Sequence, residues 1–301
     1  MNEGLKAELL KAAADLEKAF GEQSVATLED SKKLKVKFWK TGIDGLDRIL
    51  GGGMPEGKLI EIYGAFSSGK TSLAYHLMGM HEYSAIIPIE GALDPERAIM
   101  FGCDPKKTIV ANCQYGEQAM SAVLKFVKAG IPIVVLDSLP ASVPRESYEK
   151  AQKAFSKGEP FDPRIGAIPR MLAGCLYEIV NEARFSGTTV IFINQIRDRI
   201  NAPAFSETTR TPGGRIMEHM PSVRLQLARK SWIEVPNKDP EIYAEKQAVG
   251  INIRMKVVKS NVGSPNRICE APMLFDRGFV AFEDVEKARK DIMAKNREKN
   301  K

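Results

Sequence analysis

Eight residues at positions 64–71 have the types and spacing needed to bind phosphate. They read Gly-Ala-Phe-Ser-Ser-Gly-Lys-Thr, which fits the template Gly, four residues, Gly-Lys-Ser/Thr. Glycines let consecutive backbone N–H groups turn inward around phosphate oxygens, and a following helix adds its positive N-terminal end. In such a loop Lys70 reaches the β- and γ-phosphates, and the Thr71 hydroxyl ligates Mg²⁺. The octet therefore predicts a nucleotide-phosphate site.

The flanking residues indicate how the octet is positioned. An apolar run at 59–63 precedes it as a strand, and Leu73, Leu77 and Met80 follow at helical spacing. This strand–turn–helix order favours a phosphate loop over the alternative of an ordinary Gly/Ser-rich turn.

Two carboxylates follow apolar runs further along the chain. Glu90 comes after the run at 85–89, and Asp137 comes after the run at 131–136. In open α/β sheets the carboxyl ends of parallel strands face the crevice where ligands bind. Glu90 is therefore a candidate base, with a solvated strand-end carboxylate as the alternative. Asp137 is predicted to face the Mg²⁺ shell as the partner of Lys70.

A polar segment at 196–215 follows another apolar strand, at 189–193, and is too rich in Arg, Thr, Pro, Ser and Gly to pack a core. Arginines with an aromatic residue and glycines suit the backbone phosphates and stacked bases of single strands. A solvated loop is the alternative. The candidate DNA-binding residues of this segment are Arg197, Arg199, Phe205, Arg210, Gly213, Gly214 and Arg215.

Composition restricts the class of protein. With 301 residues, 44% hydrophobic and 27% charged, the chain suits one large soluble α/β domain with appendages, or two small domains. It has no apolar run of about 20 residues and no visible secretory signal, so we expect no membrane span and a cytoplasmic location. The formal net charge of +6 agrees with a nucleic-acid partner. The four cysteines are not spaced as zinc ligands and are expected to be reduced.

The pattern along the chain predicts three parts: a helix with its linker at 1–33, a core at 34–283 and a basic tail at 284–301. The first helix, at 5–20, has an apolar face that must be buried on its own domain or on a neighbouring copy, and the loose polar connection favours the neighbour. The remaining predicted elements are a strand-like segment at 34–39, a strand at 109–111, helices at 118–127 and 168–184, a polar, mobile segment at 144–163, strands at 222–227, 250–258, 268–274 and 279–282, and a charged insertion at 232–247.

Several of these motifs, in this order, resemble those of the RecA recombinase family, including its phage members of the UvsX type. The likeness covers about residues 5–280. It rests on the segments 61–64 with 67–71, 90–95, 136–138, 192–197, 213–214 with 222–225, and 256–259.

The resemblance implies an α/β fold, a RecA-like P-loop ATPase core with a mainly parallel central sheet, preceded by an N-terminal oligomerisation helix. It implies a homo-oligomer, a helical filament that uses ATP and Mg²⁺, coats single-stranded DNA and pairs it with homologous double-stranded DNA in recombinational repair. Two alternatives stay open: a ring-forming helicase or motor on the same core, and an ATP-gated scaffold that coats single strands without exchanging them.

The resemblance also assigns roles to residues. Glu90 would activate the attacking water, Gln195 would sense the γ-phosphate, and Lys259 would stabilise the transferring phosphoryl group in the neighbouring subunit. Thr71 and Asp137 would hold the metal. The implied nucleotide contacts are Gly64, Ala65, Phe66, Ser67, Ser68, Gly69, Lys70, Thr71, Ser72, Asp94 and Arg97, and a second DNA-binding stretch contains Arg164, Ile165, Gly166 and Arg170.

Four departures from the family pattern bear on this assignment. Arg97 replaces a tyrosine that stacks on adenine, and Asn261 replaces a second basic residue, which leaves Lys259 alone or assisted by Arg267. His219 stands where the family has an aromatic wedge into the neighbour, and it is assigned no role. The globular C-terminal domain that captures duplex DNA is expected to be missing, with only the tail in its place.

Overall fold

The structure, a computed structural model, describes residues 3–20, 25, 35–91, 93–160, 166–198, 209–237 and 245–299. The chain divides into two compact units, Met1–Lys37 and Phe38–Lys301. The first contains α1 (Glu3–Phe20), where the sequence predicted an amphipathic helix. Its leucines at positions 5, 9, 10 and 16 are exposed, so its apolar side chains are not buried within the unit.

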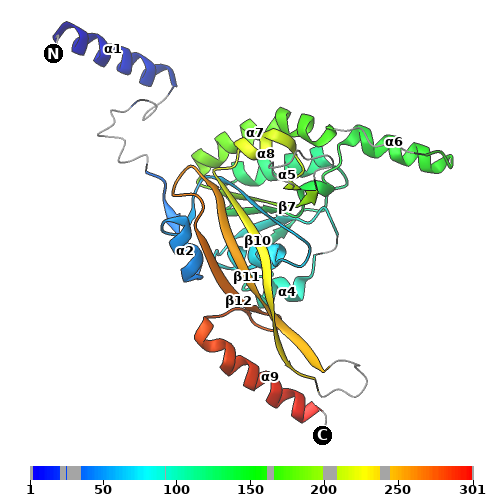
Figure 1. The fold of residues 1–301 in the computed structure, drawn as a ribbon. Coiled ribbons are helices and arrows are strands. Elements are labelled where there is room, and N and C mark those ends of the chain that lie inside the picture. The colour runs from blue at the N-terminus through cyan, green and yellow to red at the C-terminus, as the bar shows by residue number, and fades with distance from the viewer. Residues whose placement is uncertain are drawn as a thin grey trace, which may run out of the picture. The chain divides into compact units, whose positions relative to one another are not determined.

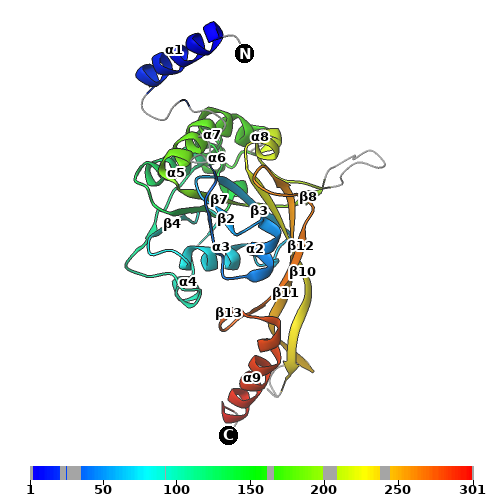
Figure 2. The same cartoon turned by 90° about the vertical axis from the view of Figure 1, so that its left-hand side faces the viewer.

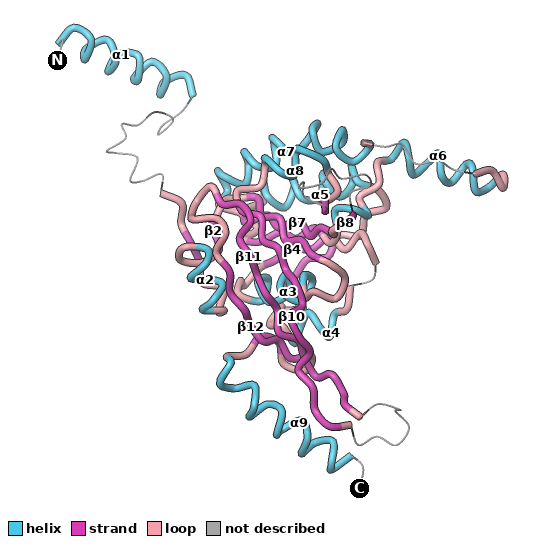
Figure 3. The backbone as a smooth tube through the Cα atoms, in the orientation of Figure 1, coloured by secondary structure: helices cyan, strands magenta, loops and turns pink. Residues whose placement is uncertain are grey.

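The second unit is built on a large sheet (Figures 1 and 3). Within the described residues the strand order is β13-β12-β11-β10-β3-β7-β6-β4-β5. The pairings from β10 through β3, β7, β6 and β4 to β5 are parallel, whereas β11, β12 and β13 add antiparallel strands. This confirms the predicted mainly parallel central sheet. The strands are β3 (Leu59–Gly64), β4 (Ser84–Ile87), β5 (Thr108–Val110), β6 (Ile133–Leu136), β7 (Thr189–Gln195), β10 (Val223–Pro236), β11 (Lys246–Ser260), β12 (Ile268–Leu274) and β13 (Gly278–Phe279).

Helices cover both faces of the parallel strands (Figure 2). Alternate residues of a strand point to opposite faces, and the two apolar clusters follow that rule. Ile60 and Ile62 pack with α3 (Lys70–Gly79), whereas Leu59 packs in the cluster that contains α5 (Gly116–Lys128) and α7 (Ala167–Ser186). Burial on both faces explains why these strands are mostly apolar in sequence.

The antiparallel strands β10 and β11 form a long hairpin that extends past the parallel strands, with α9 (Val285–Lys299) beside it (Figures 1 and 2). The sequence predicted a charged insertion at 232–247, but both strands continue into it, to Pro236 and from Lys246. Residues 285–299, predicted as a tail, form α9, whose buried Ala288 packs with Ile233 and Val235.

Two further segments differ from their predicted secondary structure. Residues 145–156, expected to be mobile, form α6 (Arg145–Ser156), because the charges that suggested a loop form Arg145–Glu149 and Lys150–Glu146 pairs across one helical turn. The predicted 34–39 strand shortens to β1 (Phe38–Trp39), which pairs with β2 (Met54–Pro55). The shorter elements are α2 (Asp44–Leu50), α4 (Pro95–Met100), α8 (Gly214–His219), β8 (Arg197–Asp198), β9 (Thr209–Arg210) and the 3₁₀ turns Leu139–Ala141 and Phe282–Asp284. None of the described helices is both long and apolar enough to cross a membrane.

Candidate active site

The octet connects the end of β3 to the start of α3, and close packing explains two of its glycines. A Cβ atom on Gly64 would lie 2.2 Å from the carbonyl oxygen of Leu227. Gly69 has φ +89°, and a Cβ atom there would lie 2.4 Å from Cδ1 of Ile253. A side chain at either position would clash, so β10 and β11 pack closely against the two ends of the octet and require glycine there.

The two side chains that follow the glycines face the loop and the neighbouring strand end. The Lys70 ammonium donates to the carbonyl oxygen of Ala65 at 2.8 Å, and the Thr71 hydroxyl donates to Oδ2 of Asp137 at 2.8 Å. Burial lowers the pKa of Lys70, although the Asp137 and Glu90 carboxylates oppose it. Burial, together with the charge of Glu90, raises the pKa of Asp137, against the Thr71 hydrogen bond and the charge of Lys70. A divalent cation placed here would favour the charged form of Asp137.

Glu90 lies where the ends of β4, β6 and β7 meet. Nε2 of Gln195 donates to Oε1 of Glu90 at 2.7 Å, and the Ser138 hydroxyl donates to Oε2. The backbone N–H of Glu90 donates to the carbonyl oxygen of Asp137 at 3.1 Å. Glu90 itself is exposed, so its carboxylate is oriented by two donors while it remains open to solvent.

Lys70, Thr71, Glu90, Asp137 and Gln195 line one cavity of about 300 Å³. Its lining includes Tyr75, which the sequence did not single out; burial and the charge of Asp137 raise the pKa of this phenol to about 12. A larger cavity, of about 520 Å³, lies between the β10–β11 hairpin and α9 and contains none of the predicted site residues. The smaller cavity is lined by Phe66, Ser67, Lys70, Thr71, Tyr75, Pro88, Glu90, Gly91, Leu93, Asp137, Ile193 and Gln195.

The residues assigned to the adenine lie beside this cavity and do not line it. Oδ1 of Asp94 accepts the backbone N–H of Arg97 at 3.0 Å and so caps α4. The Arg97 guanidinium donates to the Ser72 hydroxyl at 3.0 Å and lies 5.9 Å from the centroid of the Phe101 ring. Arg97 is therefore tied to the first turn of α3, with its guanidinium carbon over an aromatic ring.

Two observations bear on whether these residues fit a phosphate and Mg²⁺. The Ser68 hydroxyl is buried within the loop and finds no hydrogen-bond partner among the described residues. Among the described residues, no group of three or more His, Cys, Asp or Glu side chains could hold a metal ion. Mg²⁺ commonly binds through one or two protein oxygens, substrate phosphates and water. The Thr71–Asp137 pair beside the loop fits that requirement.

The described candidates for DNA binding lie at the two ends of the predicted 196–215 segment and at the start of α7. Arg197 on β8 stands opposite Arg210 on β9, and both are exposed. Gly213 precedes α8, which contains Gly214 and the exposed Arg215. Gly166 precedes α7, and Arg170 is exposed in its first turn. Arg164, Ile165, Arg199 and Phe205 lie outside the described residues.

Lys259, near the end of β11, does not line the cavity of its own chain. Its ammonium donates to the carbonyl oxygen of His219. Burial, followed by the charge of Arg224, lowers the pKa of Lys259, and Glu61 opposes that change.

The fold and the cavity define a class of protein. A phosphate loop between a central parallel strand and a helix, with an aspartate hydrogen-bonded to its threonine, identifies a P-loop α/β protein.

Comparison with known proteins narrows that class. The family model described as the RecA N-terminal domain matches residues 7–280. Protein RecA of Mycobacterium ulcerans (strain Agy99) is 37% identical over 274 residues, which are 89% of this chain and 74% of the relative. Protein RecA of Trichodesmium erythraeum (strain IMS101) is 35% identical over 269 residues, 88% of this chain and 70% of the relative. The chain therefore belongs to the RecA family.

Proposed function

We propose that this protein is a DNA-dependent ATPase that forms helical filaments on single-stranded DNA and catalyses homologous pairing and strand exchange in recombinational repair. Membership of the RecA family supports the class of activity. The observation that carries the proposal is the contact of Gln195 with Glu90 at 2.7 Å. It joins the candidate base to the strand that leads directly to Arg197, the first arginine of the candidate DNA-binding segment.

In this proposal the octet and Ser72 bind the phosphates of ATP, and Thr71 with Asp137 holds Mg²⁺. When bound, Mg²⁺ supplies positive charge to the phosphate oxygens. Glu90, oriented by Ser138, accepts a proton from the attacking water. Gln195 responds to the γ-phosphate because its amide can be shared between that group and Glu90.

Other proposed roles require a second subunit. Lys259, which does not line the cavity of its own chain, acts on the ATP of the neighbouring subunit. The exposed apolar side chains of α1 dock on an adjacent copy.

Asp94 and Arg97 contact the adenine. The DNA is gripped by the arginines and glycines at 164–170 and 197–215.

A strand-exchange assay tests the proposal. A labelled single strand is incubated with the protein, Mg²⁺ and ATP, and a homologous duplex is then added, with a heterologous duplex as the control. We expect transfer of the label into duplex with the homologous partner only. ATP-dependent coating without transfer would instead identify a scaffold, and closed hexamers seen by electron microscopy would identify a ring-forming motor.

A further inference from the structure

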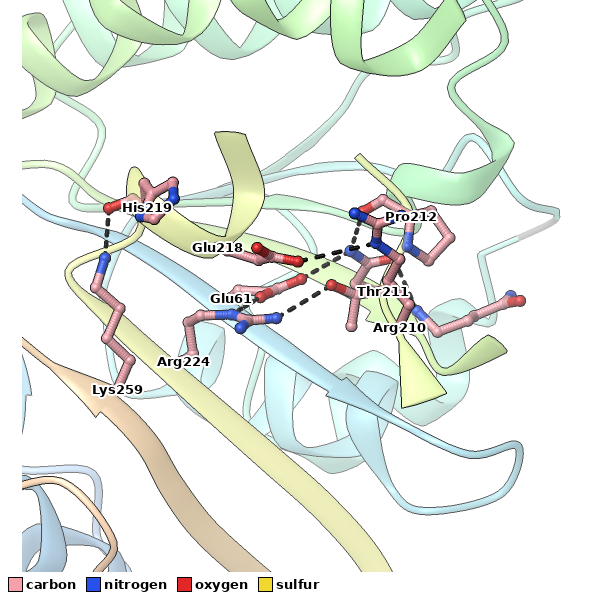
Figure 4. Close-up of polar contacts among 10 residues, drawn as sticks. Glu61, Arg210, Thr211, Pro212, Glu218, His219, Arg224 and Lys259 are labelled. Carbon is pink, nitrogen blue, oxygen red and sulfur yellow. Dashed lines mark hydrogen bonds and ion pairs between the residues drawn. The ribbon is translucent and has the colours of Figure 1, made fainter. Parts of the chain in front are cut away.

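Glu61 on β3 and Arg224 on β10 form an ion pair inside the second unit (Figure 4). The two residues are direct partners in the parallel pairing of these strands, and Nε of Arg224 lies 2.5 Å from Oε2 of Glu61. Glu61 is fully buried, and the Arg224 side chain is 13% exposed. The pair thus lies between two central strands of the sheet, and neither residue lines the candidate active-site cavity.

Both partners of the ion pair contact the chain just after β9. Nη2 of Arg224 donates to the Thr211 hydroxyl at 3.1 Å (Figure 4). Nδ2 of Asn194 donates to Oε1 of Glu61 at 2.7 Å and to the carbonyl oxygen of Pro212 at 2.9 Å. Thr211 and Pro212 are thereby tied to β3, β7 and β10 at once.

Asn194 also connects this network to the candidate active site. Its Oδ1 accepts the backbone N–H of Gln195 at 2.9 Å, and the side chain of Gln195 donates to Glu90. At the other end of the network, Thr211 directly follows β9, which pairs with β8. Hydrogen bonds, joined by covalent steps through Gln195 and from Thr211 to Arg210, therefore connect Glu90 to the strand pair that holds Arg197 and Arg210.

Stability alone does not explain an ion pair at this position. Well-packed apolar residues of similar volume are often as stabilising as a buried ion pair, because both charges lose their hydration. Charged donors and acceptors instead form hydrogen bonds of fixed geometry. The guanidinium fork and the carboxylate therefore fix the positions of the groups they contact. Burial is the largest influence on the Glu61 carboxyl and raises its pKa, whereas Arg224, Asn194 and Thr211 lower it. The charged form of Glu61 thus depends on these three neighbours.

We infer that the Glu61–Arg224 pair is a positioning element through which the state of the Glu90–Gln195 contact sets the placement of β8 and β9, and hence the affinity for single-stranded DNA. This inference rests on the proposed function. Glu61 and Arg224 act through Asn194, Thr211 and Pro212.

The test measures how strongly nucleotide and DNA binding are coupled. The affinity for a fluorescent oligonucleotide is determined with and without Mg²⁺ and a non-hydrolysable ATP analogue, and the ratio of the two affinities is compared among variants. Thr211→Val removes one hydroxyl and keeps the ion pair, and Arg224→Lys keeps the charge and removes the fork. The control is Lys230→Met. Lys230 lies on β10, like Arg224, and the substitution removes its exposed ion pair with Glu270 of β12.

Allosteric coupling typically amounts to about 5–150-fold. We expect a ratio in that range for the wild type and the Lys230→Met control, and a ratio reduced about fivefold or more in Thr211→Val and Arg224→Lys. The affinity for the ATP analogue without DNA should be unchanged. Partial unfolding would not mimic this result. The analogue stabilises the folded state, so the active fraction would be larger with the analogue than without it, and the ratio would rise and not fall.

Three results would decide against the inference. Wild-type ratios in both variants would show that the ion pair does not transmit the nucleotide state; if Arg224→Lys does not fold, a wild-type ratio in Thr211→Val suffices. A loss of analogue affinity with an unchanged ratio would assign the pair to the nucleotide site alone. If the wild-type protein binds the oligonucleotide with the same affinity with and without the ATP analogue, the proposed function is overturned, and the inference with it.

Discussion

Two polar networks share strands β3 and β7 and differ in how their charges are satisfied. In the candidate active site, Glu90 is exposed, and burial holds the pKa of Asp137 above its usual value. The Lys70 ammonium donates to a carbonyl oxygen of its own loop, that of Ala65. Around Glu61, each carboxylate oxygen accepts a hydrogen bond from Arg224 or Asn194. The first network, of Lys70, Glu90 and Asp137, faces a cavity and has charge available for a ligand; we call it the open network. The second network, of Glu61, Arg224 and Asn194, satisfies its charges within the protein, and we call it the closed network.

This difference separates binding from positioning. A group that binds a ligand must keep some of its hydrogen-bonding capacity or charge uncompensated until the ligand arrives. A group that positions others is most effective when its own geometry is fixed by saturated hydrogen bonds. Gln195 and Asn194 are adjacent in sequence, yet one contacts the open network and the other the closed one.

The largest effect on stability should come from breaking the closed network on one side. Arg224→Met leaves the Glu61 carboxylate buried without its counter-charge, which typically costs about 3–5 kcal/mol. Urea unfolding followed by circular dichroism measures this change in the free energy of unfolding. The double variant Glu61→Leu/Arg224→Met removes both charges and should lose less stability than the single variant. A single-variant cost below about 1 kcal/mol would mean that Glu61 is not a buried charge.

A substitution in the open network should instead lower the rate of ATP hydrolysis and leave the free energy of unfolding unchanged. Glu90→Gln preserves the shape of the side chain and its contact with Gln195 but removes the candidate base, so ATP hydrolysis should fall by about 10² or more. Binding of ATP and DNA should persist. A steady-state phosphate-release assay measures the rate, with the exposed Glu96→Gln on α4 as a matched control. Undiminished turnover would reject Glu90 as the base.

The open network could be predicted from the sequence because its chemistry depends on short-range patterns. The octet, Glu90 and Asp137 each stand directly after an apolar run, and strand ends of a parallel sheet meet at one edge. The closed network has no such pattern. Glu61 and Arg224 are 163 positions apart, and a charge within an apolar strand does not reveal its partner. Only the parallel pairing of β10 with β3 brings them together.

The fold was predictable for a related reason. Strands buried on both faces read as apolar runs, so β3, β6 and β7 were placed closely from sequence. The outer half of the β10–β11 hairpin and helix α6 were missed, because their exposed charges hide the periodicity that marks a strand or a helix. Their partners, such as Lys246 with Glu234, are recognisable only once the elements exist.

A third prediction separates exposed arginines from the buried one. Arg197→Ala with Arg215→Ala should weaken binding to single-stranded DNA and reduce the slope of log K against log salt by about 0.7 for each phosphate that is no longer neutralised. The free energy of unfolding should stay within about 0.5 kcal/mol of the wild type, since both side chains are exposed. Oligonucleotide titrations at several salt concentrations measure the slope, with the exposed Arg254→Ala on β11 as the control. An unchanged slope would assign DNA binding to other residues.

The smallest effect should come from an ion pair that shares a strand with Arg224 and lacks its burial. Lys230 lies 2.7 Å from Glu270, but the Lys230 side chain is 56% exposed. Exposed pairs contribute about 0.2–1 kcal/mol, because water solvates both charges and salt screens their attraction. Lys230→Met should therefore change the free energy of unfolding by less than about 1 kcal/mol, and less still in high salt. The same urea titration compares it directly with Arg224→Met. Equal losses for the two variants would remove burial as the cause of the difference, and the distinction between the closed network and an ordinary surface pair would no longer hold.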